Sequence, residues 1–275
     1  MQLASRFAHR SPVLRSAHPL SDDQIRTVAP SIFADTPHES RSERYSYIPT
    51  AAVLTELRKE GFQPFMVCQT RVRQQDRRDY TKHMLRLRHE SQINGTEANE
   101  IILLNSHDGT SSYQMLAGLF RFVCQNGLVC GDTFADVRVP HKGDVTDHVI
   151  EGAYEVLHGF DQVQNSRDAM RGITLHDSEA EVFARSALAL KYDEPGKTLP
   201  ITESQILRPR RFDDNREDLW STFNRIQENL VKGGLTGRSA NGRQQRTRPV
   251  QGIDQNVRLN RALWLLADGL RQLKV

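Results

Sequence analysis

The chain has 275 residues, of which 37% are hydrophobic and 26% charged, with a formal net charge of +3. This length and balance suit a globular protein with a real core and argue against an intrinsically disordered chain. No apolar run approaches the roughly 20 residues that span a bilayer, so no membrane-spanning helix is expected. Cys68, Cys124 and Cys130 lack disulfide-framework spacing, which favours reduced thiols in a cytoplasmic protein.

The first third of the chain predicts an irregular arm followed by a helix. Residues 1–48 contain four prolines and only weak periodicity, so they predict an N-terminal arm with little regular structure. The stretch "PTAAVLTELRKEGF" at 49–62 predicts a helix that Thr50 caps and Gly61 ends.

A β-rich region follows. Residues 64–74, 82–90 and 100–106 read as strands, and the last is apolar enough to be central in a sheet. In "KHMLRLRHE", two leucines alternate with Arg86 and Arg88, which predicts one apolar and one cationic strand face.

Two turns are predicted next to the strand at 112–124. Asp108-Gly109 supplies the positive φ of a tight turn before this strand. Asn126-Gly127 is expected to turn the chain again after it.

Beyond residue 143 the apolar period becomes helical, at spacings of three and four residues. Four helices are predicted, on the stripes Val149/Ala153/Val156/Phe160, Ala180/Phe183/Ala187/Leu190, Leu219/Phe223/Ile226/Leu230 and Leu259/Leu263/Leu266/Leu270. The second also has Ser178 and Glu181 at capping-box spacing. The class is therefore α+β, with an antiparallel sheet of about three to five strands packed against helices and a helical C-terminal half. We expect a single domain over 49–272, with a flexible basic loop at 232–252.

The segment 105–130 contains the residues with most potential for chemistry. His107 and Asp108 are adjacent, which does not establish the geometry of a catalytic triad, so a local turn is the favoured interpretation. Five residues separate Cys124 from Cys130, more than the two to four typical of half a zinc site. The sequence thus predicts no catalytic residue, no metal site, no cofactor and no enzymatic activity.

Basic residues gather in two segments, which is the strongest functional signal. Between Arg71 and Glu90 seven Arg or Lys residues stand against three acids, and 231–253 holds five Arg or Lys residues with no acid. Arginine donates planar pairs of hydrogen bonds to phosphate, so an anionic partner is expected. The predicted nucleic-acid-binding residues are Arg71, Arg73, Arg77, Arg78, Lys82, Arg86 and Arg88 in the strands and Lys232, Arg238, Arg243, Arg246 and Arg248 in the loop.

Two stretches, "NSHDGT" and "FRFVCQNGLV", occur close together, and "RPRRFDDNREDLW" and "NRALWLLADGL" follow later. These stretches resemble a large prophage- and plasmid-borne family of unknown function, the YfjQ/YafZ-type proteins. The resemblance covers the chain from about Leu20 onward. The resemblance implies an accessory protein of a bacterial mobile element and transfers no catalytic residue. The predicted order of elements is also similar to the core of single-strand annealing proteins, which form rings that hold the DNA backbone in a basic groove.

The leading hypothesis is a cytoplasmic protein that binds nucleic acid, preferentially single-stranded DNA, possibly during annealing or recombination. It would act as a homo-oligomer without contact to a membrane. One alternative is a protein-binding inhibitor of host defence, since charged surfaces also serve protein interfaces. Another is a metal-dependent nuclease built around His107, Asp108 and the cysteines.

Overall fold

The computed structural model describes residues 12–72, 74–122, 126–130, 136–139, 146–192, 199–239 and 242–274. The chain divides into two compact units, Met1–Phe160 (unit 1) and Asp161–Val275 (unit 2). The division falls within the long helix α4 (Thr146–Arg171). The single domain over 49–272 stays a prediction.

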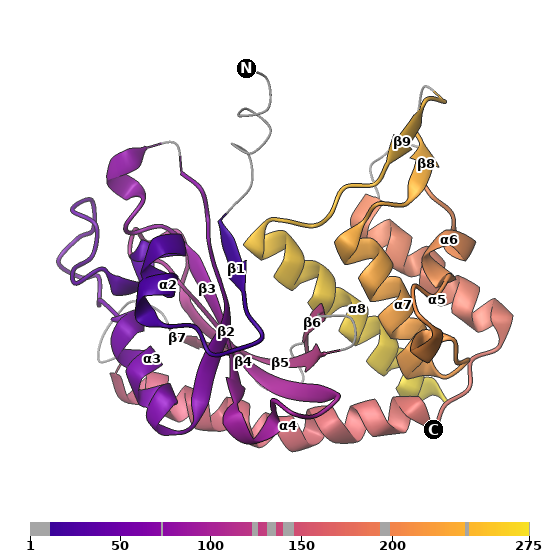
Figure 1. Ribbon diagram of the computed structural model, residues 1–275, viewed down its shortest axis with the longest axis horizontal. Helices are drawn as coiled ribbons and strands as arrows, with labels where there is room; N and C mark the ends of the chain where they lie inside the picture. Colours follow the sequence, from indigo (N-terminus) through magenta and orange to yellow (C-terminus); the bar gives the residue numbers. More distant parts are fainter. Residues whose placement is uncertain are drawn as a thin grey trace. The chain divides into compact units, whose positions relative to one another are not determined.

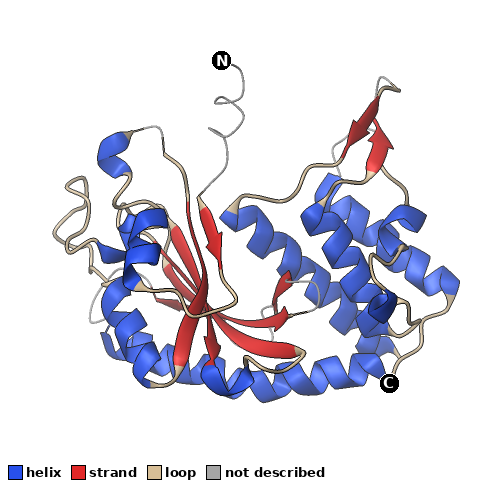
Figure 2. Ribbon diagram, viewed as in Figure 1, coloured by secondary structure: helices blue, strands red, loops and turns tan. Residues whose placement is uncertain are grey.

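Unit 1 is built on an antiparallel 7-stranded sheet in the order β1-β2-β3-β4-β5-β6, with β7 also paired to β5 (Figures 1 and 2). The antiparallel α+β class is confirmed, and the described strands outnumber the predicted three to five. The strands are β1 (Val13–Arg15), β2 (Phe62–Gln69), β3 (His83–His89), β4 (Glu97–Asn105), β5 (Tyr113–Arg121), β6 (Asn126–Val129) and β7 (Asp136–Val139).

The described part of the predicted arm, residues 12–48, contains regular structure up to Phe33. It contains β1, the helix α2 (Asp22–Val28) and a short 3-10 helix, η1 (Pro30–Phe33). Ser21 and Gln24 form a capping box at the start of α2, and the side chains of Ile25 and Ile32 are fully buried. The prediction of little regular structure is thus wrong for residues 13–33, whereas residues 34–48 contain no helix or strand.

The helix α3 (Thr50–Lys59) lies where 49–62 predicted it, and Gly61 follows its end at φ 82°. Thr50 is not its cap, because the cap position belongs to Pro49. The Thr50 hydroxyl lies instead 2.9 Å from Nε2 of His83 on β3. The threonine therefore joins the helix to the sheet.

The central strand β4 is confirmed, since every residue from Ala98 to Asn105 is buried. On one face of the sheet His83 and Asn105 contact Thr50, so this face packs against α3 and η1. Side chains alternate along a strand, so Arg86 and Arg88 point to the opposite face.

Unit 2 is mostly helical, which confirms the helical C-terminal half. After α4 come α5 (Asp177–Tyr192), α6 (Glu203–Leu207), α7 (Leu219–Lys232) and α8 (Ile253–Leu273). The predicted stripe of α7 is fully buried, and Phe223 packs with Trp220 and Trp264, whose ring centroids lie 5.5 and 6.1 Å away. These rings form the core of the unit.

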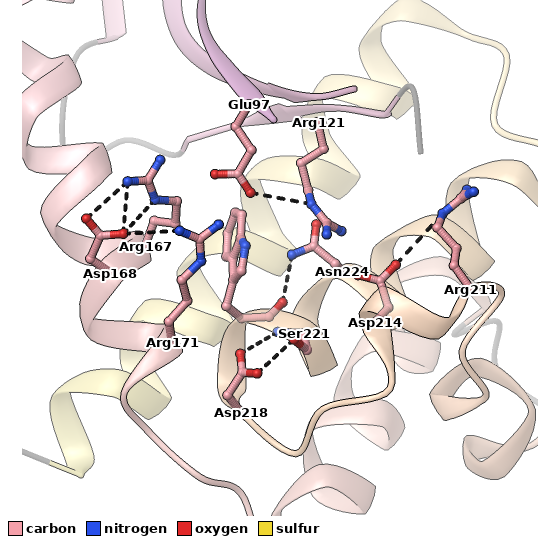
Figure 3. A network of polar contacts seen from close by, with 11 residues as sticks. Glu97, Arg121, Arg167, Asp168, Arg171, Arg211, Asp214, Asp218, Ser221 and Asn224 are labelled. Carbon is pink, nitrogen blue, oxygen red and sulfur yellow. Dashed lines mark hydrogen bonds and ion pairs between the residues drawn. The ribbon is translucent and has the colours of Figure 1, made fainter. Parts of the chain in front are cut away.

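The start of α7 is held by polar contacts from the "RPRRFDDNREDLW" stretch (Figure 3). Asp218 is the cap, because its carboxylate accepts hydrogen bonds from the backbone N and the hydroxyl of Ser221, both at 2.8 Å. Asp214 forms an ion pair with Arg211, Nε to Oδ2, at 3.9 Å. The acids of this motif therefore have structural roles.

The helix at 178–190 is confirmed as α5, but its first turn differs from the prediction. Glu179, not Glu181, accepts a hydrogen bond from the backbone N of His176 at 2.8 Å.

Among the described residues, no helix combines the length and apolarity needed to cross a membrane.

Candidate nucleic-acid interface

The predicted basic loop 232–252 contains a β-hairpin in unit 2. Its strands are β8 (Thr236–Arg238) and β9 (Gln244–Arg246), and in Figure 1 the hairpin (orange) extends beyond α6 and α7 of the same unit. The backbone ladder continues toward α7, since Gly234 N donates to Thr247 O and Val250 N to Val231 O, both at 2.8 Å. Much of the predicted loop is thus a two-stranded β-hairpin whose base is held by backbone hydrogen bonds.

The hairpin exposes its cations because it has no large apolar side chain to bury. Arg238, Arg243, Arg246 and Arg248 are all exposed. Lys232 differs from them, because its Nζ lies 2.8 Å from the Glu228 carboxylate, which offsets its charge. Four of the five predicted loop residues thus present their charge to solvent.

A cavity of about 690 Å³ lies at the base of this hairpin. None of its described lining residues is acidic. Glutamines contribute amide groups that donate and accept hydrogen bonds. The residues relevant to anion binding are Lys191, Tyr192, Arg238, Arg246 and Arg248, with Gln245, Gln251 and Gln255 beside them. We call this set the hairpin groove.

Lys191, at the end of α5, joins the groove to α7 through two hydrogen bonds. Its Nζ donates hydrogen bonds to the backbone O of Leu230 at 2.5 Å and to that of Arg248 at 3.3 Å. Burial lowers the pKa of Lys191 to about 8, so the amine is still largely protonated at neutral pH. Lys191 and Tyr192 could not be predicted from the sequence, because only tertiary packing brings the end of α5 beside Arg238, Arg246 and Arg248.

The second basic segment is the loop between β2 and β3 in unit 1. Arg71 and Arg78 are exposed, Arg77 and Lys82 are half-buried, and Arg73 lies outside the described residues. The amide of Gln69 donates to the backbone O of Arg78 at 2.7 Å, which fixes the loop to β2. This loop keeps exposed arginines but also carries two acids, Asp76 and Asp79.

Arg86 and Arg88 are not on an exposed face, so this part of the prediction is wrong. Their side chains are only 8% and 4% exposed, and Glu100 on β4 lies between them. The Glu100 carboxylate is 2.6 Å from Nε of Arg86 and 2.8 Å from Nε of Arg88. Because Glu100 and the two arginines face the same side of neighbouring strands, the charges are buried together.

Gly127 makes room for this cluster. The predicted Asn126-Gly127 turn is wrong, because both residues belong to β6, where Gly127 pairs with Phe120. A Cβ atom on Gly127 would lie 2.0 Å from Nη1 of Arg86. Glycine is therefore needed here to leave space for a guanidinium.

Gly127→Ala is expected to lower the free energy of unfolding by about 1–3 kcal/mol, the usual cost of overpacking a buried site. Gly269→Ala in α8 is the matched control, since nothing lies within 4 Å of its Cβ position. The control is expected to stabilise by up to about 1 kcal/mol through helix propensity. Urea unfolding measures both changes, and equal effects at the two positions would contradict the assigned role of Gly127.

The segment around His107 and Asp108 is a buried turn. Gly109 has φ 74°, and Oδ1 of Asp108 accepts hydrogen bonds from the backbone N and the hydroxyl of Thr110, so the predicted Asp-Gly turn is confirmed. The His107 ring is buried between Tyr47 and His83, at centroid distances of 4.9 and 5.3 Å. These contacts give both residues structural roles.

Burial disfavours reactivity of the two described cysteines, Cys68 and Cys130. Cys130 is buried, and burial raises the pKa of its thiol well above the ordinary value, which disfavours the nucleophilic thiolate. The same cause raises the pKa of Cys68 to about 12. Cys124 lies outside the described residues. Within the described ranges, His, Cys, Asp and Glu form no group of three or more that could hold a metal ion.

His83 makes the stability of unit 1 depend on pH. Its ring nitrogens lie 2.9 Å from the hydroxyls of Ser31 and Thr50, and burial, followed by the nearby His107, lowers its pKa well below 6.5. The unfolded chain takes up a proton here below about pH 6.5, whereas the folded protein does not. The contribution of His83 to the free energy of unfolding is therefore complete above about pH 6.5 and declines as the pH falls below it.

We expect unfolding free energies measured in urea from about pH 7.5 to 5 to fall faster for the wild type than for His83→Gln. The difference is up to about 1.4 kcal/mol per pH unit below 6.5. Parallel curves for the two proteins would mean that His83 titrates similarly in the folded and unfolded states.

Comparison with known proteins places these features in a family. Residues 37–264 match the model of a domain of unknown function, DUF932. Two Escherichia coli K12 proteins, UPF0380 protein YafZ and UPF0380 protein YfjQ, are each 58% identical over 269 residues, which cover 98% of this chain and 97% of theirs.

The chain belongs to the DUF932 family.

The match confirms the resemblance to the YfjQ/YafZ-type proteins drawn from the sequence motifs. No solved structure is significantly similar to this DUF932 protein. The family name describes no activity, so any function must be argued from the geometry of its surfaces.

Proposed function

We propose that this DUF932 protein binds nucleic acid in the cytoplasm, preferentially single-stranded DNA, through the hairpin groove. The observation that carries the proposal is the grouping of Lys191, Arg238, Arg246 and Arg248 around one cavity whose described lining has no acid. Guanidinium groups donate paired hydrogen bonds to phosphate oxygens. The exposed arginines of the loop 71–82 supply a second contact.

The groove favours contact with the backbone over reading of bases. Arginines and amide groups outnumber aromatic rings, and Tyr192 is the one aromatic among the described lining residues. Such a groove can follow a sugar-phosphate backbone while a base stacks on the tyrosine ring. The protein would then bind many sequences with similar affinity.

The test is the dependence of affinity on salt. Counterion release gives a slope of log affinity against log salt of about −0.7 for each phosphate contacted on a single strand. If the four exposed hairpin arginines each contact one phosphate, the slope is about −3. Fluorescence anisotropy with a labelled oligonucleotide at several salt concentrations measures it. A slope near zero rejects the proposal, and tighter binding to a duplex rejects the preference for single strands.

We infer that such binding serves DNA annealing or recombination of a mobile element, with the protein acting as a homo-oligomer. Backbone contacts leave base edges accessible for pairing with a second strand. Complementary labelled oligonucleotides should therefore anneal faster with the protein than without it, and light scattering should give a mass above that of one chain. Unchanged annealing rates would leave a binding protein without the annealing role.

A further inference from the structure

The sheet of unit 1 has a cavity that the hairpin groove does not explain. Its volume is about 490 Å³, within the range typical of small-molecule sites. Its lining includes Arg15 of β1, Arg86 and Arg88 of β3, and the rings of Phe120 and Phe122. All of these residues belong to unit 1.

The cavity wall carries an excess of positive charge. Arg86 and Arg88 share the single carboxylate of Glu100, so one of the two buried charges has no equal counter-charge within this trio. Arg15, which is exposed at the rim, adds a third guanidinium. Although Arg15 is exposed as a residue, its guanidinium is partly desolvated, and this desolvation, followed by repulsion from Arg86, lowers the pKa of Arg15.

Another pair of opposite charges belongs to this sheet. Arg121 and Glu97 pair with each other, Nε to Oε1 at 3.5 Å. By strand alternation both side chains leave the sheet on the face opposite Arg88 and Glu100. The described lining of the cavity contains three arginines and no acid, so the charged groups that an anion would meet there are guanidinium groups.

Two of the other lining residues, Phe120 and Phe122, are aromatic. The Arg88 guanidinium lies 3.4 Å from the centroid of the Phe120 ring and 4.7 Å from that of Phe65. Phe122 meets Phe120 edge to face, with centroids 5.1 Å apart, and is half-buried. A ring half-open to a cavity can pack against the flat body of a ligand.

We propose that this cavity binds a small organic phosphate monoester of mononucleotide size. The phosphate, with a charge of about −1.5 to −2 at neutral pH, accepts hydrogen bonds from the arginines, while the planar body packs against Phe122. The site lies in unit 1 and the hairpin groove in unit 2, so neither proposal depends on the other.

Isothermal titration with adenosine 5′-monophosphate tests the site. One molecule should bind per chain, and adenosine and inorganic phosphate should each bind at least about tenfold more weakly, because each offers half of the interaction. Absence of nucleotide binding at millimolar concentration, or equal binding of all three probes, overturns the proposal.

Two variants assign the binding to this cavity. Arg15→Gln, at the exposed rim, and Phe122→Ala should each weaken nucleotide binding about five- to tenfold, and circular dichroism checks their folding. Arg44→Gln makes the same charge change at another exposed position of unit 1 and should leave binding unchanged. If both cavity variants bind as the wild type does, or the control weakens equally, the site is wrong.

A third variant separates this site from the hairpin groove. Gln substitutions of Arg238, Arg246 and Arg248 should leave nucleotide affinity within about twofold of the wild type, because the two sites belong to different units and share no lining residue. Loss of nucleotide binding in that variant would place the nucleotide in the hairpin groove and overturn the present assignment.

Discussion

Replacing Glu100 by glutamine is expected to lower the free energy of unfolding by about 3–5 kcal/mol, the usual cost of breaking a buried ion pair. Glu100 is fully buried and contacts both Arg86 and Arg88. Without its charge, two buried guanidinium groups would face each other with no anion between them. Urea unfolding with linear extrapolation measures the loss.

Glu56→Gln is the matched control for this change. Glu56 on α3 also pairs with a cation, Lys59, at 2.8 Å, but both side chains are more than 60% exposed. Water screens such pairs, so the control should lose no more than about 1 kcal/mol. A similar small loss in Glu100→Gln would mean that the buried cluster tolerates an uncompensated charge.

The combined substitution of Arg238, Arg246 and Arg248 by glutamine is expected to weaken binding to a single-stranded oligonucleotide about 100-fold at 0.1 M salt. The factor follows from three phosphate contacts at about 0.7 each, and the salt slope should become less steep by about 2. All three side chains are exposed, so the unfolding free energy should change by less than about 0.5 kcal/mol.

A control with the same charge change distinguishes local contact from net charge. Arg171, Arg208 and Arg216 are also exposed in unit 2 but do not line the groove. Their triple glutamine variant should bind within about threefold of the wild type, since distant exposed charges are largely screened. Equal losses in both variants would show that binding depends on overall charge and not on the groove.

Much of the fold could be predicted because it depends on local apolar patterns. The helical stripe of Leu219, Phe223, Ile226 and Leu230 and the continuous apolar run of β4 gave their elements directly. The helices and strand of segment 13–33 could not be predicted, because they are short and prolines stand between them. Its one clear signal was Ser21 with Gln24, a capping box at the start of α2.

The surface was harder to predict than the fold. Alternation in β3 correctly separated two leucines from Arg86 and Arg88, but it could not tell which face meets water. The burial of the arginine face depends on Glu100, twelve positions beyond Arg88, and on Phe120 and Phe122. Charges on a strand reveal exposure only when the partners on neighbouring strands are known.

Asn126-Gly127 illustrates the same limit. The dipeptide is a strong local turn signal, yet in β6 the glycine serves a guanidinium of β3. A residue's role was set here by a side chain more than forty positions away. Only the three-dimensional arrangement distinguishes a glycine chosen for its backbone freedom from one chosen for its missing side chain.

The hairpin described above is bonded to its unit at its base and along β8, where Arg238 N donates to Pro200 O at 2.9 Å and Nε2 of Gln205 donates to Thr236 O at 2.7 Å. At the base, Val250 N donates to Val231 O of α7, and Thr247 N donates to Leu235 O. Residues 242–246, at the other end of the hairpin, are exposed throughout. Its backbone amides should therefore exchange with deuterium quickly at the tip and slowly at the base. A polyanion lying along the arginines would slow exchange at the tip first, so the footprint of a bound strand can be mapped without altering a single residue.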